Sequence, residues 1–86
     1  MHMPADIRVT VRLFASLREA AGSDRLELSM PRATPVGAVW DLLPGGVAEA
    51  PPPGGLRYAV NHVWSIPGTP LRDGDEVALV LPVSGG

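Results

Sequence analysis

Two stretches of the chain alternate strictly between apolar and polar residues, and this pattern constrains the fold more than any other feature. The apolar positions are Ile7, Val9, Val11 and Leu13 in residues 7–13, and Leu26, Leu28 and Met30 in residues 25–30. A repeat of two residues places one kind of side chain on each face of a β-strand. We therefore predict two strands, each with one buried face, and Pro31 ends the second.

Glycine and proline divide the rest of the chain into short elements. Each occurs ten times among the 86 residues, which excludes long helices, coiled coils and collagen-like repeats. Residues 44–55 contain three consecutive prolines and are typical of a surface loop. Residues 56–64 are a strand candidate. Residues 76–81, apolar on both faces, form the last strand, after a turn in which Gly74 supplies a positive φ.

Two helices are predicted between these strands. Ser16 and Glu19 have the spacing of a capping box, and Gly22 is well placed to end this short helix. Thr34 and Pro35 begin the second helix, because a hydroxyl cap followed by proline loses no amide partner. Its apolar stripe consists of Val36, Val39, Trp40 and Leu43. We assign Trp40 to the core.

Together these elements predict an α+β fold. The chain is long enough for one domain, and its order is strand, short helix, strand, helix, loop, strand, turn, strand. The first and last strands are the most apolar, which favours neighbouring positions at the centre of one sheet. The helix at residues 34–43 can cover the inner face of that sheet.

Composition excludes several kinds of chemistry. The chain has no cysteine, so disulfides, thiolate metal sites and thiol nucleophiles are impossible. All seven basic residues are arginine, which excludes a Walker-type phosphate loop and a Schiff-base lysine. The net charge is −2 with scattered arginines, so we expect neither nucleic acid nor a membrane as a partner. Without an apolar run of about 18 residues or a visible secretory signal, the expected compartment is the cytoplasm.

No cluster of side chains points to catalysis or metal binding. Ser65 lies near His62 in the sequence, but no acidic residue adjoins them to complete a triad. Asp73, Asp75 and Glu76 lack the further oxygen ligands of a calcium loop and indicate a charged turn. We therefore expect no metal site and no active site of the chain's own.

The sequence ends with Pro82, Val83, Ser84, Gly85 and Gly86. Two residues without a Cβ make a thin strand that can thread into the narrow active site of another protein. Pro82 has no amide to donate, so it keeps this tail from extending the sheet. A terminal carboxylate is unreactive until activated, and adenylation by ATP would make it an acyl donor. The alternative is an idle or truncated end.

Several stretches together resemble the MoaD family, the small sulfur-carrier subunit of molybdopterin synthase. They are residues 11–22, 59–61 and 71–78, the last running on to 82–86, with the helix at 34–43 between them. The resemblance implies a ubiquitin-like β-grasp: a mixed sheet of four to five strands, one main helix packed across it and a short helix after the first strand. Residues 1–86 would form this single domain, with a core at about 6–81 and a flexible diglycine tail at 82–86.

The resemblance also implies a role for the tail. A ubiquitin-activating-type enzyme of the MoeB type would consume ATP to adenylate the Gly86 carboxylate, and sulfur would replace the adenylate to give a thiocarboxylate. A large synthase subunit of the MoaE type would bind the tail, with Pro82, Val83, Ser84 and Gly85 threaded into it, and pass the sulfur to a cyclic pterin precursor. The chain would then be the non-catalytic, sulfur-donating subunit of a sulfurtransferase, with no tightly bound cofactor.

Three apolar residues are candidates for a partner interface. Phe14, Trp64 and Val80 are not obviously needed by the helix-covered face of the sheet. Exposed apolar residues gathered on one surface usually mark a partner site. We therefore predict that these three residues belong to a partner interface. For Trp64, a place in the core is an equally favoured alternative.

Other functions of a diglycine tail stay open. A carrier for thiamine, cysteine or tRNA thiolation would use the same tail, although thiamine carriers are shorter and usually lack the motif at residues 14–22. A ubiquitin-like modifier or binding module would conjugate the tail or leave it idle. Because the chain has no lysine, it cannot form isopeptide chains on its own side chains.

Overall fold

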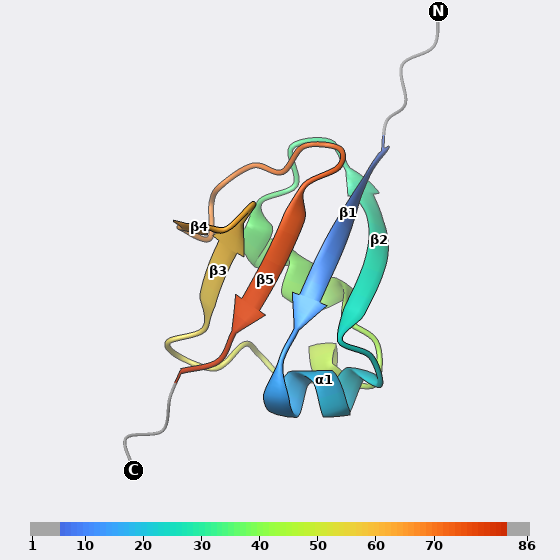
Figure 1. Cartoon of the computed structure of the whole chain (residues 1–86), viewed down its shortest axis with the longest axis vertical. Helices are drawn as coiled ribbons and strands as arrows, with labels where there is room; N and C mark the ends of the chain where they lie inside the picture. The colour runs from blue at the N-terminus through green and yellow to red at the C-terminus, as the bar shows by residue number, and fades with distance from the viewer. Residues whose placement is uncertain (1–5, 83–86) are drawn as a thin grey trace, which may run out of the picture.

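A five-stranded mixed sheet forms the centre of the computed structural model, which describes residues 6–82 (Figure 1). The strands are β1 (Asp6–Leu13), β2 (Arg25–Pro31), β3 (Arg57–Val60), β4 (Val63–Ser65) and β5 (Glu76–Val80). Their order across the sheet is β2-β1-β5-β3-β4. β1 and β5 are parallel, and the other neighbouring pairs are antiparallel. The predicted central position of the first and last strands is confirmed.

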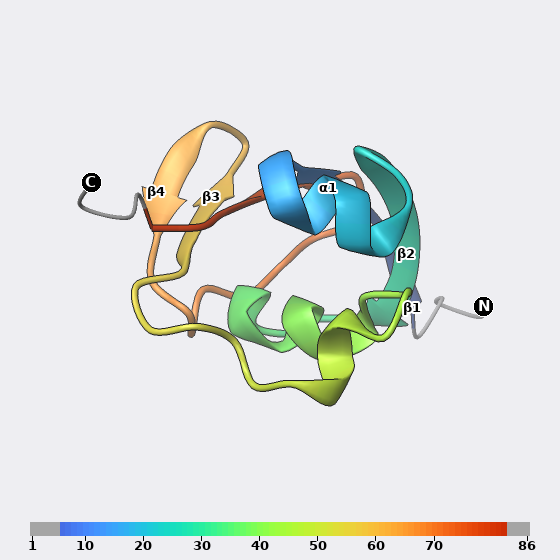
Figure 2. The same cartoon turned by 90° about the horizontal axis from the view of Figure 1, so that it is seen from below.

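The core lies between one face of this sheet and the helical segments. The four apolar residues predicted for β1 are all buried, as are Val77 and Leu79 of β5. Two 3₁₀ helices, η1 (Val36–Leu42) and η2 (Val47–Glu49), lie on one side of the sheet, and α1 (Ala15–Ala21) closes the end at which β1 finishes (Figures 1 and 2). Among residues 6–82, no helix lies on the opposite face of the sheet (Figures 1 and 2).

The predicted main helix is shorter and more tightly wound than the sequence suggested. All four members of its apolar stripe are buried, and Trp40 Nε1 donates a hydrogen bond to the Ala50 carbonyl at 2.7 Å. The amides of Val36 and Gly37 donate to the carbonyls of Thr69 and Pro67, so the first turn is bonded to a neighbouring loop. The prediction that Thr34 caps the helix is wrong: its hydroxyl donates to the Pro31 carbonyl at 2.6 Å.

The short helix begins two residues earlier than the predicted capping box on Ser16 requires, so the capping box is wrong. Phe14 is the extended N-cap residue, and its carbonyl accepts hydrogen bonds from the amides of Leu17 and Arg18. Ser16 therefore already lies inside α1, where its hydroxyl makes no cap. The predicted end is confirmed, because Gly22 has φ of 81° and its amide donates to the Arg18 carbonyl.

The single strand predicted at residues 56–64 is two strands, β3 and β4, because the chain reverses within this range. Asn61 and His62 have φ of 51° and 70° and form a two-residue turn between β3 and β4. The Asn61 side chain stabilises this turn by accepting from the Glu76 amide and donating to Asp75 Oδ1, both at 3.0 Å. The hairpin consequently returns Trp64 to a position opposite Ala59.

Candidate functional site: the open sheet face and the tail

The face of the sheet without helices is assembled from all five strands. Val77 and Leu79 point into the core, so Glu76, Ala78 and Val80 of β5 point the other way. Residues directly opposite each other in neighbouring strands share a face. One row across this face consists of Trp64, Ala59, Ala78 and Arg12, from β4, β3, β5 and β1 in turn. We call this surface the open face.

The structure brings the three predicted interface residues to the open face. Phe14 follows β1 and lines a shallow depression of about 120 Å³ together with Ala59 and Ala78. Phe14 is 46% exposed and Trp64 56% exposed, so the alternative of Trp64 as a core residue is wrong. Val80 is half-buried on the same face and pairs with Arg57 of β3.

The Trp64 ring has a cation as its neighbour. The guanidinium carbon of Arg57 lies 4.4 Å from the centre of the ring, within the range of a cation–π interaction. This contact holds a large apolar ring at the surface without burying it. A binding partner can therefore meet a ring whose orientation is already restricted, which lowers the entropy cost of association.

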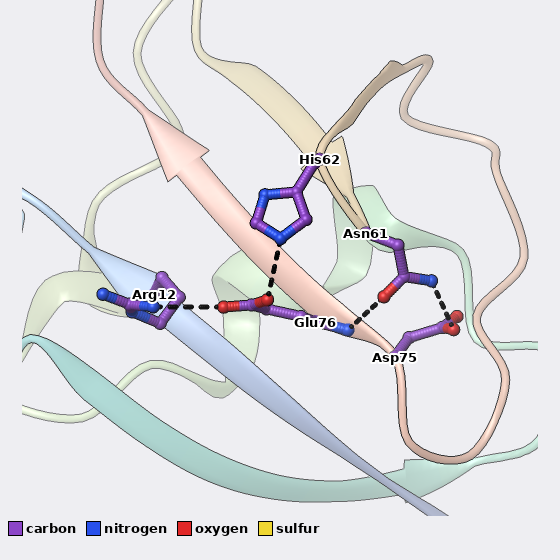
Figure 3. A network of polar contacts seen from close by, with 5 residues as sticks. All are labelled: Arg12, Asn61, His62, Asp75 and Glu76. Atoms are coloured by element: carbon purple, nitrogen blue, oxygen red, sulfur yellow. Dashed lines mark hydrogen bonds and ion pairs between the residues drawn. The ribbon is translucent and has the colours of Figure 1, made fainter.

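A polar network borders the apolar part of the open face (Figure 3). Glu76 accepts a hydrogen bond from Arg12 Nη1 at 3.1 Å, and His62 Nε2 lies 3.4 Å from its other carboxylate oxygen. Asn61 links the backbone of Glu76 to the Asp75 carboxylate. Because these side chains come from β1, β5 and the β3–β4 turn, the network connects three parts of the sheet and leaves charged groups at the rim.

The tail leaves the sheet at the same end as two of these apolar residues. β1 and β5 are parallel, so Phe14, just after β1, and Val80, the last residue of β5, lie at one end of the sheet (Figure 1). Pro82 is exposed and follows β5 by two residues. Gly55, at φ of 86°, leaves room for it, since a Cβ there would lie 3.3 Å from Pro82 Cβ.

The other predicted tail residues, Val83, Ser84, Gly85 and Gly86, lie outside the described residues. Within residues 6–82 no group of three or more histidine and acidic side chains could hold a metal ion. No helix in that part of the chain is long and apolar enough to cross a membrane.

Several residues of the open face were missed by sequence reasoning. Arg57 and Ala59 reach it only through the register of the β3–β4 hairpin, which the alternation did not reveal. Ile66, exposed to 74%, lies close to Trp64 just beyond the end of β4 and extends the apolar surface there. Asn61 was the one residue in the sequence that could have indicated the β3–β4 turn, because asparagine tolerates the left-handed conformation that such a turn requires.

The sequence matches a known family, and the structure resembles several solved ones. Residues 11–86 match the model of the ThiS family. SAMP1 from Haloferax volcanii has a TM-score of 0.76 at 28% identity, covering 92% of this chain and 99% of that chain. A chain in the complex of subunits 1 and 2 of molybdopterin-converting factor from Helicobacter pylori 26695 has a TM-score of 0.59 at 26% identity, covering 93% and 100%.

A ubiquitin from Caldiarchaeum subterraneum has a TM-score of 0.61 at 20% identity, covering 94% of this chain and 99% of that chain, and its likeness concerns the fold alone. No protein of curated function matches the chain at a significant level. The solved structures confirm the predicted ubiquitin-like β-grasp fold.

Proposed function

The chain belongs to the ThiS family, and on that premise we propose that it is a sulfur carrier of the MoaD type in molybdopterin biosynthesis. The observation that carries the proposal is the family match, which runs through Gly85 and Gly86. The likeness to a chain in the complex of subunits 1 and 2 of molybdopterin-converting factor supports a large synthase subunit as the partner. The motif at residues 14–22, which thiamine carriers usually lack, favours this pathway over the thiamine one.

In this proposal the chemistry takes place on the Gly86 carboxylate. A carboxylate oxygen attacks the α-phosphorus of ATP on a MoeB-type activating enzyme, and pyrophosphate leaves. Hydrosulfide released by a sulfur donor then attacks the acyl carbon, its sulfur replaces the AMP oxygen on that carbon, AMP leaves, and the product after loss of the sulfur's proton is a thiocarboxylate. Within a MoaE-type subunit this sulfur passes to a cyclic pterin precursor. The activating enzyme and the large subunit supply the acids and bases, and this chain supplies the acyl group.

The open face gives the partner a surface next to the tail. Phe14 and Val80 lie at the sheet end from which Pro82 departs, and Trp64 stands on the same face. A partner seated on these residues receives residues 82–86 from the adjoining edge. Because proline lacks an amide hydrogen, Pro82 cannot continue the ladder of β5, which frees the following residues to enter the partner.

Intact-mass measurement tests the sulfur-carrier proposal. The protein, with Gly86 as its untagged carboxyl terminus, is incubated with a cognate adenylating enzyme, ATP and a sulfur donor, beside a variant lacking Gly86. We expect a mass gain that matches one oxygen exchanged for sulfur, and only when Gly86 is present. Absence of both adenylate and thiocarboxylate, with the enzyme active on another carrier, would refute the proposal. The pathway is then identified by adding the large subunit and the cyclic pterin precursor and following loss of the added sulfur.

A ubiquitin-like modifier is the second candidate, and the likeness to SAMP1 at 28% identity favours it. A modifier would transfer the activated Gly86 acyl group to an amine of a target protein, forming an amide. The distinguishing result is a covalent product of higher mass that survives denaturation and thiol treatment. A carrier instead gives free protein in which one oxygen is exchanged for sulfur. Since the chain has no lysine, its own side chains offer no amine for a polymer.

A further inference from the structure

A second concave site lies at the other end of the sheet from Pro82. This cavity has a volume of about 710 Å³ and is open to solvent on one side. The start of β1, the turn after β2 and residues 70–73 line it. In Figure 1 these three segments meet at the top of the molecule, whereas the described chain ends at the bottom. The cavity is therefore separate from the open-face depression and the tail.

The floor of the cavity is apolar and its walls are tied to the fold. Ile7 and Leu71 belong to the floor and are 4% and 2% exposed. The Leu71 amide donates to the Thr34 carbonyl at 2.9 Å, which joins the turn after β2 to residues 70–73. On the other side, the Arg8 amide donates to Asp73 Oδ1 at 2.8 Å. These contacts hold a site that exists before any ligand arrives.

The charge around the cavity differs from that of the chain as a whole. Three of the seven arginines line it, Arg8, Arg32 and Arg72, against two of the nine acidic residues. Within residues 6–82, neither the Arg8 nor the Arg72 guanidinium has an ion-pair partner. One of the acidic residues, Asp73, already accepts a backbone hydrogen bond. The lining of this cavity therefore has an excess of one positive charge, in a chain whose net charge is −2.

We propose that this cavity binds a small organic anion, a carboxylate or phosphate attached to an apolar body. The volume falls within the range of about 300–1,000 Å³ that is usual for small-molecule sites. Guanidinium groups present paired donors that match carboxylate and phosphate oxygens. The apolar floor takes the body of the ligand, and Arg8 and Arg72 take its charge. This site goes beyond the sulfur-carrier function and does not depend on it.

Titration with two simple anions and a neutral analogue tests the proposal. Phenyl phosphate and phenylacetate are added to the ¹⁵N-labelled full chain, with benzyl alcohol as the uncharged probe, and amide shifts are followed by NMR. We expect both anions to shift the amides of Ile7, Ala33 and Leu71, and the tighter of the two to identify the preferred anion. Benzyl alcohol should bind at least about tenfold more weakly, because it cannot form charge-assisted hydrogen bonds.

A matched pair of variants assigns the effect to the two unpaired guanidiniums. Arg8→Gln with Arg72→Gln should lower anion affinity about tenfold or more, and the fold is kept because the contacts of both residues are made by their backbones. Arg25→Gln is the control, since this exposed arginine also bonds through its backbone, to Ser23, and lies at the opposite end of the sheet. It should leave the affinity unchanged.

Three results would overturn the proposal. The first is equal affinity for the neutral and anionic probes. The second is unchanged affinity in the double variant, whose amide spectrum reports on its fold. The third is a set of shifts confined to Phe14, Trp64 and Val80, which would place the anions on the open face. Sulfur loading of Gly86 is measured separately, so failure of one proposal leaves the other standing.

Discussion

The two faces of the sheet use the same strands for different purposes. On the covered face, the β5 residues Val77 and Leu79 are fully buried against the helical segments. On the open face, the alternate residues of that strand are Glu76, Ala78 and Val80, and all are at least partly exposed. In the proposed function this strand would contribute to stability through one face and to recognition through the other, so its outward residues could change without loss of the core.

The contrast also explains the size of the side chains on each face. Burial of large apolar groups is the main source of folding free energy, so the covered face carries branched and aromatic residues. On the open face, Ala59 and Ala78 lie side by side at the centre of the sheet, with Phe14 and Trp64 around them. Small residues with larger apolar ones around them leave a shallow depression, a shape that a protruding partner side chain can fill.

The largest expected effect comes from the tail, which we expect to be needed for sulfur loading but not for stability. Removal of Gly86 should abolish sulfur loading completely while leaving the melting temperature unchanged, because the core of the part of the chain that the structure describes, residues 6–82, is complete within residues 7–81. Intact mass measures the loading, and thermal unfolding measures the stability. A clearly lower melting temperature for the truncated protein would show that the tail contributes to the fold.

The next effect tests the covered face directly. Leu79→Ala should lower the free energy of unfolding by about 2–5 kcal/mol, because it leaves a cavity at a fully buried position. Its neighbour in the same strand supplies the matched control: Val80→Ala, on the open face, should cost about 1 kcal/mol or less. Chemical denaturation of both variants measures the difference. Equal losses would mean that the two faces share the stabilising role.

The covered face was largely predictable from the sequence, and the open face was not. Alternation located β1 and β2, and the helical spacing identified the buried stripe of η1, because burial repeats with the period of the element. The open face depends on the hairpin register, and Asn61-His62 differs from the asparagine–glycine pair that usually signals such a turn. The prediction for Ser16 failed because the extended backbone of β1 continues through Phe14. The Phe14 carbonyl accepts the first hydrogen bonds of α1, so Ser16 lies inside the helix and cannot cap it.

A charge placed on the open face should weaken binding more than folding. Val80→Asp is expected to reduce affinity for the large synthase subunit about tenfold or more, since an interface that excludes water leaves the new carboxylate without a partner. Isothermal titration with the purified large subunit measures the affinity. Ser29→Asp is the control, because Ser29 pairs with Arg8 on the same face but lies on β2, away from the apolar residues. Unchanged affinity for Val80→Asp would remove this residue from the interface.

The smallest expected effects have opposite signs at two neighbouring positions of the β3–β4 turn. His62→Gly should stabilise the protein by about 1 kcal/mol or less, because glycine relieves the left-handed backbone at φ of 70° but gains freedom in the unfolded chain. Asn61→Gly relieves the same kind of strain yet removes both side-chain hydrogen bonds to residues 75 and 76, so it should destabilise by about 1 kcal/mol. Denaturation midpoints of the two variants measure the difference. If both variants were stabilised equally, the Asn61 side chain would have no part in holding the hairpin that presents Trp64.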